Sequence, residues 1–294
     1  MTPTEKIQNT IKTARTPPAP PKKRKLLSGI EGVGNNILLA GQTATGKSSF
    51  IADLAINGLK CFTMFTDLGN TGLNGMRSYA HSKGKLKEFD ENHRYVLFNS
   101  NELEEVEAFI DNPEAVVEGY NDFSPNVSCW DGFGFHLKNS LTPDVEELVN
   151  KDKGYADLGF DNTAMMRGWG LVRNAIVRTL DKFLTSASGS TKIATCGVKF
   201  RSIVTSGDPN SPNAVREQIP LDEPDIDTGA KRVIQFAFDL ALITKIATKD
   251  EPPIKKGEYC YKLGGEYCKK RYKLPELMPA GAYALLQEIE KQRK

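Results

Sequence analysis

The sequence predicts an α/β fold in which a mainly parallel sheet is flanked by helices and a C-terminal β-hairpin follows. Short apolar runs recur along the chain with little polar alternation, which is typical of strands buried on both faces. Helical segments lie between several of these runs, and such alternation indicates parallel strands covered by helices on both sides. A glycine-rich turn joins the first apolar run to the first helical segment.

The first half of the chain predicts four strands and two helices. A strand at residues 37–40 is followed by a helix at 50–57, which Gly58 could cap at its C-terminal end. The acidic segment 102–110 is interpreted as a helix that lies between the third and fourth strands. The second, third and fourth buried strands are predicted at residues 61–66, 95–99 and 127–130.

Residues 132–166 are polar and irregular, and we interpret them as an insertion. An amphipathic helix is predicted at 168–184, because apolar residues recur there at i, i+4 spacing. A fifth strand is predicted at 192–196. The segment 198–229 then follows, and its prolines, glycines and low apolar content from residue 206 onward predict a long mobile loop.

The C-terminal part predicts a sixth strand at residues 238–246. Two further runs, at 259–263 and 267–274, are joined across Gly264 and Gly265, which predicts the closing hairpin. A final helix is predicted from about residue 282 to the end of the chain.

Residues 1–25 differ in character from a single domain at 26–294. Residues 5–14 could form a short helix, and prolines then dominate an extended linker. The basic cluster at 22–25 resembles a nuclear localisation signal or a phosphate-binding tail, but a solvated run of charge is the favoured interpretation.

Composition excludes several classes of protein. The chain has 294 residues, of which 39% are hydrophobic and 26% charged, with a net charge of +2, so a globular domain is expected. We find no apolar stretch near the ~20 residues of a membrane helix and no apolar signal-peptide core. Five widely spaced cysteines favour reduced thiols, and three histidines lack zinc-ligand spacing. We therefore expect a cytoplasmic protein, in the host cytoplasm if it is viral.

Residues 41–48 match the P-loop pattern G-x4-G-K-[ST] at every fixed position. The glycines let the backbone curl so that successive N–H groups point at one anion, and the helix N-terminus adds partial positive charge. Lys47 can reach the β- and γ-phosphates, and the Ser48 hydroxyl can bind Mg²⁺. ATP and Mg²⁺ are therefore the predicted cofactors. The predicted nucleotide-binding residues are Gly41, Gln42, Thr43, Ala44, Thr45, Gly46, Lys47, Ser48 and Ser49.

Two carboxylates complete the predicted catalytic set with Lys47. Asp131 directly follows the fourth strand, where an acid would hold Mg²⁺ through water, although it could instead only open a turn with Gly132. Asp67 follows the second strand and could orient the attacking water. A role for Asp67 as a helix or turn cap is an equally open interpretation.

Basic residues gather in two segments that could contact nucleic acid. In the long loop these are Lys199, Arg201 and Arg216. In the C-terminal hairpin, basic residues are interleaved with tyrosines, a pattern in which cations follow the backbone and rings stack on bases. An exposed hairpin whose lysines discourage edge pairing is the competing interpretation. The hairpin residues concerned are Lys269, Lys270 and Arg271.

The order of these elements resembles the RecA-type ATPase core and, more narrowly, the phage RecA-like ATPases of single-strand annealing and recombination. The resemblance covers roughly residues 27–275. It depends on the 41–48 motif, on Asp67 and on the strand ending at Asp131. The remaining support comes from the helix 169–184, from Thr195, Cys196 and Lys199, and from the late strand at 238–240.

The resemblance implies that Lys47 and Ser48 bind ATP–Mg²⁺ and that Asp131 is the magnesium acid. It also implies that the segments 132–166 and 198–229 face single-stranded DNA. Subunits would assemble into a ring or filament with ATP between neighbours. The acidic character of the 132–166 insertion suits a protein partner better than DNA.

Other functions share the same nucleotide residues. A RecA-core helicase or loader, or an ATPase that remodels a protein, is the main alternative to a recombination or annealing ATPase. A small-molecule kinase and a nucleotide-gated structural protein with slow turnover also remain open, because the sequence identifies the phosphate site more clearly than the partner.

Overall fold

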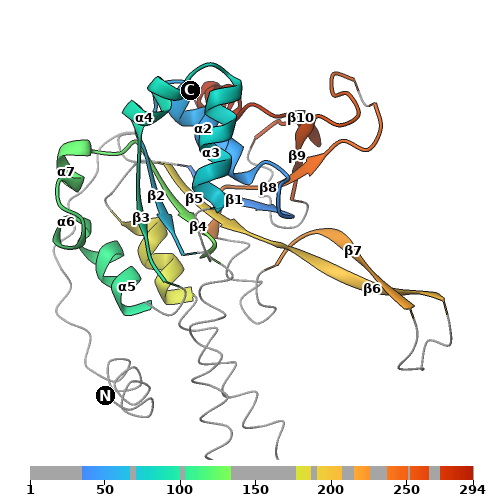
Figure 1. Ribbon diagram of the computed structural model, residues 1–294, viewed down its shortest axis with the longest axis horizontal. Coiled ribbons are helices and arrows are strands. Elements are labelled where there is room, and N and C mark those ends of the chain that lie inside the picture. The colour runs from blue at the N-terminus through green and yellow to red at the C-terminus, as the bar shows by residue number, and fades with distance from the viewer. Residues whose placement is uncertain are drawn as a thin grey trace, which may run out of the picture.

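The computed structural model describes residues 35–66, 71–99, 103–133, 177–186, 191–206, 215–225, 237–250, 252–264 and 272–293. These residues form an α/β fold around an eight-stranded sheet with helices on both faces (Figure 1). The strand order is β10-β9-β8-β1-β5-β4-β2-β3, and a separate two-stranded sheet pairs β6 with β7.

Six strands of the main sheet run parallel, and the two strands at the C-terminal edge are antiparallel. The parallel strands are β1 (Asn36–Gly41), β2 (Cys61–Phe65), β3 (His93–Leu97), β4 (Val127–Asp131), β5 (Thr191–Cys196) and β8 (Leu240–Ile246). β9 (Tyr259–Leu263) pairs antiparallel with β8, and β10 (Leu277–Pro279) pairs antiparallel with β9. The prediction of a mainly parallel sheet is therefore confirmed.

Two apolar clusters lie on opposite faces of the sheet. Neighbouring side chains of a strand point to opposite faces, so alternate residues of β1 belong to different clusters. Leu38 joins one cluster, and Ile37 and Leu39 join the other. Both clusters are buried, which explains why the central strands are apolar along their whole length.

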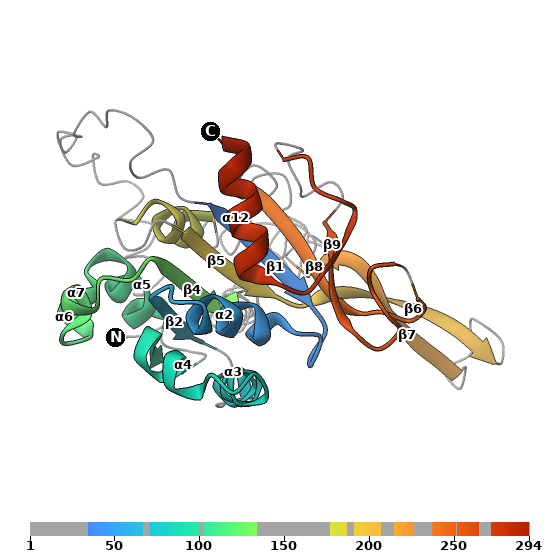
Figure 2. The ribbon, with the colours of Figure 1, turned by 90° about the horizontal axis from the view of Figure 1, so that it is seen from above.

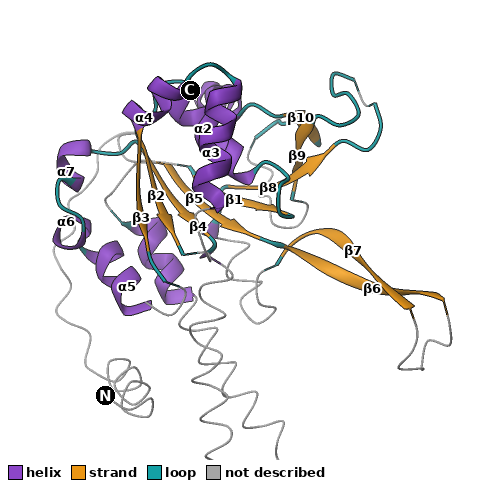
Figure 3. Cartoon of the chain, viewed as in Figure 1, coloured by secondary structure: helices purple, strands orange, loops and turns teal. Residues whose placement is uncertain are grey.

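Helices cover the two faces (Figures 2 and 3). The Ile37 face packs against α2 (Lys47–Ile56), α3 (Thr71–Ser82), α4 (Leu86–Asn92) and α12 (Ala282–Arg293). The Leu38 face packs against α5 (Leu103–Asp111), α7 (Tyr120–Phe123) and the helix at 177–185. The short α6 (Pro113–Val116) lies between α5 and α7.

Gly58 ends α2 as predicted. Its φ of 92° is left-handed, and glycine adopts that conformation without a side-chain clash. The Gly58 N–H donates to the Ala55 carbonyl at 3.1 Å, and the Leu59 N–H donates to the Leu54 carbonyl at 3.2 Å. This pair of bonds is a Schellman motif, which satisfies two of the last carbonyls of the helix.

Residues 198–206 and 215–224 differ from the predicted mobile loop. β6 (Val198–Ser206) and β7 (Val215–Pro224) pair as a long antiparallel ribbon, hereafter the β6–β7 arm, which projects from the body of the protein (Figure 1). The Asp225 N–H donates to the Gly197 carbonyl at 2.8 Å and closes the base of the arm. Cross-strand pairing compensates for the low apolar content on which the loop prediction depended.

Two other strand predictions need correction. β3 begins at His93 rather than at residue 95, because the short α4 ends directly before it. β9 pairs with β8 and with β10, so the C-terminal hairpin forms with residues 277–279 rather than with 267–274. Residues 272–274 are not strand, and 267–271 lie outside the described residues.

Several predictions fall outside the described residues: the N-terminal helix, linker and basic cluster within 1–34, nearly all of the 132–166 insertion, and the first half of the helix predicted at 168–184. Among the described residues, the buried cysteines form no disulfide, as expected for reduced thiols: Cys61, Cys129, Cys196 and Cys260. No described helix combines the length and apolar character that crossing a membrane requires.

Candidate functional site

The 41–48 segment forms the turn between β1 and α2 and takes two left-handed residues to do so. Ala44 has a φ of 61° and Gly46 a φ of 102°. Gly46 also immediately precedes α2, so the chain curls sharply before the helix starts. A side chain at Gly46 would be strained by this φ, and its Cβ would lie 3.3 Å from the ring of Tyr259.

The turn is fixed against β8 by a pair of threonines. The Thr45 and Thr244 hydroxyl oxygens lie 2.7 Å apart, and the Thr45 hydroxyl also donates to the Gln42 carbonyl at 2.8 Å. Gly41 lies beside them, and a Cβ at Gly41 would come within 1.9 Å of the Thr244 hydroxyl. Only glycine therefore fits at position 41 while Thr244 keeps this place.

Lys47 turns back over the same segment. Its ammonium donates to the carbonyls of Gly41 at 2.7 Å and Gln42 at 2.9 Å. Gly46 has no side chain with which to cap α2, and no acidic residue stands in the first turn of this helix. The first N–H groups of α2 and the Lys47 ammonium thus give this corner a positive character, which suits an anion.

Asp131 lies at the carboxyl end of β4 and is 7% exposed. The Thr195 hydroxyl at the end of β5 donates to Asp131 Oδ1 and accepts the Gly132 N–H at 3.0 Å. On the other side, the Thr66 hydroxyl and N–H both donate to the Asp131 carbonyl at 3.1 Å. The Thr66 bonds fix the Asp131 backbone, and the Thr195 bond orients its carboxylate at the edge of the sheet.

Two glycines on one face of α3 lie next to the site: Gly72 faces Asp131, and Gly75 faces Ser48. A Cβ at Gly72 would lie 2.7 Å from Asp131 Oδ2, and a Cβ at Gly75 would lie 3.6 Å from the Ser48 Cβ. Residues three apart on a helix share a face, with roughly 5–6 Å between their Cβ positions. The Ser48 hydroxyl and the Asp131 carboxylate therefore lie on one side of α3.

This donor set fits Mg²⁺ held with phosphate rather than an all-protein metal cage. Within the described ranges, no group of three or more His, Cys, Asp and Glu side chains could hold a metal ion. Mg²⁺ usually keeps several waters and takes one or two protein ligands plus phosphate oxygens. Ser48 and Asp131 supply one hydroxyl and one carboxylate of that kind.

Cys196, the residue after Thr195, points away from this edge. Its side chain joins the apolar cluster on the Leu38 face, whereas Thr195 reaches Asp131. Burial raises the pKa of the Cys196 thiol to about 12, although the nearby Lys47 charge opposes this shift. Cys196 is therefore a neutral core residue, and Thr195 is the polar group that β5 contributes to the site.

The predicted nucleic-acid residues that the structure describes all lie on the β6–β7 arm. Arg201 pairs across the strands with Ile219, and Arg216 pairs with Val204. These pairs alternate along the ribbon, so the two arginines lie on opposite faces of it. Phe200 is 53% exposed and shares the face of Arg216. Lys199 precedes it near the base of the arm.

The remaining predicted site residues lie outside the described residues. They are Asp67, Lys269, Lys270 and Arg271. Of the 41–49 set, the structure places Thr43 and Ala44 exposed at the turn and buries Gly41 and Thr45 beneath it. Lys47, Ser48 and Asp131 lie at the same edge of the sheet, as the sequence predicts.

Sequence reasoning did not identify the second set of residues around this edge. Gly72 and Gly75 carried a signal, because glycines three apart in a helix allow close approach. No local pattern indicates that Thr244 and Tyr259 contact the 41–48 segment, because both residues lie on strands about 200 residues later in the chain. Phe200, between Lys199 and Arg201, could have been found as an aromatic residue within a basic run.

A scan against protein-family models found no match to this chain, and a search of curated proteins found no significant match.

Proposed function

We propose that this protein binds ATP with Mg²⁺ at the 41–48 segment and hydrolyses it as a RecA-like ATPase that acts on single-stranded DNA in phage-type recombination or annealing. One observation carries the proposal most: Lys47 and Ser48, which begin α2, and Asp131, which ends β4, lie together at the carboxyl edge of a parallel sheet. Ligands of open α/β sheets bind outside this edge.

The 41–48 segment supports phosphate binding through its backbone. The left-handed turn at Ala44 and Gly46 leads directly into the first N–H groups of α2. In the proposed complex, the Lys47 ammonium exchanges the Gly41 and Gln42 carbonyls for β- and γ-phosphate oxygens. Charge-assisted bonds to phosphate are stronger than bonds to neutral carbonyls, which favours that exchange.

Ser48 and Asp131 support the magnesium assignment. The Ser48 hydroxyl would bind the ion directly, and the Asp131 carboxylate would hold one of its waters. The bound ion would neutralise charge that develops on the phosphates during transfer. Thr195 acts as a positioning residue, because its hydroxyl bond to Asp131 fixes which carboxylate oxygen faces the site.

The assignment to a RecA-like ATPase is supported by the connection from β5 to the arm. Thr195 contacts Asp131, and only Cys196 and Gly197 separate it from the start of β6. A change at the nucleotide site could therefore reach the arm through a short stretch of chain. ATP-dependent contact with DNA by the segment after the fifth strand is what the resemblance implies.

The β6–β7 arm supports contact with nucleic acid. It exposes Phe200, Arg201 and Arg216 on a ribbon that stands away from the body. Arginine side chains follow a phosphate backbone, and an exposed ring can stack on a base of any identity. Asp67 remains the predicted water-orienting residue, and assembly into a ring or filament remains a prediction.

The test is the ATPase rate with and without single-stranded DNA, at about 50 and 200 mM salt. We expect stimulation by DNA that fades at the higher salt concentration, because counterion release weakens backbone contacts. ATP turnover that is indifferent to DNA would instead favour an ATPase that remodels a protein. Strand displacement on a forked duplex would favour a helicase.

A further inference from the structure

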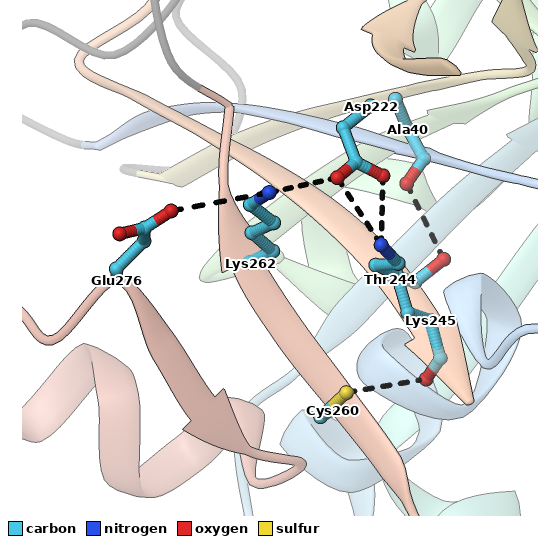
Figure 4. Close-up of polar contacts among 7 residues, drawn as sticks. All are labelled: Ala40, Asp222, Thr244, Lys245, Cys260, Lys262 and Glu276. Atoms are coloured by element: carbon cyan, nitrogen blue, oxygen red, sulfur yellow. Dashed lines mark hydrogen bonds and ion pairs between the residues drawn. The ribbon is translucent and has the colours of Figure 1, made fainter. Parts of the chain in front are cut away.

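Asp222, on the return strand of the arm, lies between two lysines of the main sheet (Figure 4). The Lys245 ammonium on β8 donates to Asp222 Oδ1 at 2.8 Å and to Oδ2 at 3.1 Å. The Lys262 ammonium on β9 donates to Oδ2 at 2.8 Å and lies 3.9 Å from Glu276 Oε1. Two cations from different strands therefore meet on one oxygen atom.

The sheet itself brings these lysines together. β8 and β9 are antiparallel neighbours in which Lys245 opposes Cys260 and Ile243 opposes Lys262. Lys245 and Lys262 are therefore diagonal neighbours on one face, a separation that long side chains span. Their approach is set by strand register, and it does not depend on Asp222.

Lys245 and Lys262 line a hollow of about 420 Å³. Most of the other polar groups that line it also suit an anion. Lys249 and Thr248 contribute a third ammonium and a hydroxyl, and Glu276 is the acidic residue of the lining. Partial burial raises the pKa of Asp222, but bonds from Lys245 and Lys262 outweigh this effect and lower it below its usual value.

We propose that Lys245 and Lys262 form a second phosphate-binding site, for the phosphoryl group of a nucleic-acid backbone or of a free polyphosphate, and that Asp222 occupies it as a tethered competing anion. This site goes beyond the proposed function, because it lies outside the 41–48 segment and includes none of its residues.

The charge and the exposure of these side chains indicate that another anion can replace the Asp222 carboxylate. The side chains of Asp222, Lys245 and Lys262 are 31–40% exposed, so solvent screening keeps each ion pair weak. A phosphoryl group in this place can also be drawn in by Lys249, which lines the same hollow. Asp222 belongs to the arm, so movement of the arm would withdraw the competitor.

The experiment compares the full-length protein with Asp222→Asn and with Glu223→Gln. Both substitutions remove one negative charge from adjacent positions of β7, but only the first removes the carboxylate that the lysines hold. Binding is measured by anisotropy with labelled single-stranded DNA and by calorimetry with inorganic tripolyphosphate. The tripolyphosphate series is made in a Lys47→Ala background to remove binding at the 41–48 segment.

We expect Asp222→Asn to tighten binding of at least one probe by about 3- to 10-fold, because loss of the two weak ion pairs frees the site. Lys262→Ala added to Asp222→Asn should cancel this gain. A gain with DNA alone identifies the nucleic-acid backbone as the ligand, and a gain with tripolyphosphate alone identifies a free polyphosphate.

An equal gain in Glu223→Gln, or no gain with either probe, would overturn the second site. Unfolding midpoints of all variants check that the arm and sheet remain folded. ATP binding in the absence of DNA is measured separately, in the presence of intact Lys47. If the 41–48 segment does not bind nucleotide, this measurement will show no ATP binding. If only the second site is wrong, ATP binding in this measurement will be unchanged.

Discussion

The Thr195 hydroxyl joins Asp131 to the next strand of the sheet: it donates to the Asp131 carboxylate and accepts the N–H of Gly132. Thr195 thereby orients the predicted magnesium acid and satisfies a buried backbone donor at the same time. Removing this one hydroxyl should affect both stability and turnover, since both partners are buried.

Thr195→Val keeps the shape of the side chain and removes both bonds. We expect a loss of about 1–3 kcal/mol in the free energy of unfolding, because a buried N–H loses its acceptor. We also expect a higher Mg²⁺ requirement for ATP turnover. Thr191→Val, at the other end of the same strand, is the control for stability. Unchanged Mg²⁺ dependence in Thr195→Val would contradict a positioning role.

Lys47→Ala should abolish ATP-dependent turnover while the fold is retained. The Lys47 ammonium donates to two carbonyls of the turn, and α2 is held by its buried apolar side chains. Turnover and nucleotide binding are measured together with the unfolding midpoint. Lys87→Ala, an exposed lysine on α4, is the matched control. Normal turnover in Lys47→Ala would remove the basis for the phosphate site.

Gly72→Ala and Gly75→Ala form a pair that tests the approach of α3. A Cβ at Gly72 would lie 2.7 Å from Asp131 Oδ2 and 2.8 Å from Phe65 Cε1, so something must shift. We expect a destabilisation of about 1–3 kcal/mol and a raised Mg²⁺ requirement. Gly75→Ala meets Ser48 at an ordinary 3.6 Å and should be neutral or stabilising, since alanine favours helix.

The comparison uses chemical unfolding and Mg²⁺ titrations of turnover. Equal behaviour of the two alanine variants would show that α3 does not depend on a close contact at Asp131.

Phe200→Ala should weaken binding to single-stranded DNA. Phe200 is 53% exposed on the arm, and loss of one ring–base stack costs about 1–3 kcal/mol, which corresponds to roughly 5- to 150-fold in affinity. Val215→Ala, equally exposed on the arm, removes apolar surface without a ring. Titration of labelled oligonucleotide measures both, and equal losses would argue against stacking.

His93 should make stability fall at mildly acidic pH. Burial is the main cause that lowers its pKa from 6.5 to about 4, and Arg94 adds to this. Between these two values the unfolded chain binds more protons than the folded one, so stability decreases as the pH falls from 6.5 towards 4. The full loss from this residue approaches about 3 kcal/mol.

Urea unfolding across this pH range, with His93→Gln as the comparison, isolates the contribution of the histidine. The difference between the two proteins should grow as the pH falls through the window. A constant difference would show that His93 is not the group responsible.

Much of the fold could be predicted from sequence, because the central strands and α2 have strong local patterns. The apolar runs at β1, β2 and β5 and the cap at Gly58 were located to within a residue or two. The β6–β7 arm was not, because its two strands are stabilised by pairing with each other and carry polar, proline-containing sequence.

The candidate site likewise has residues that the sequence identifies and contacts that only the tertiary structure shows. Residues 41–48 form a local motif, and Asp131 follows a local strand pattern, so both could be read directly. Thr195 belongs to the strand end on which the resemblance partly depends, but the sequence does not predict which group its hydroxyl contacts. Its bond to Asp131 depends on β4 and β5 being neighbours, which strand order decides.

By itself, the sequence determined what depends on neighbours in the chain: the strand–turn–helix at 37–56, the glycines of the turn and the lysine beside them. Tertiary structure alone decided which distant groups meet them. Asp53 of α2, for example, accepts the Tyr283 N–H at the start of α12 at 3.0 Å, across 230 residues. Thr45 meets Thr244, and Asp222 meets Lys245 and Lys262, for the same reason. Register between strands and packing between layers set these contacts, and local sequence encodes neither.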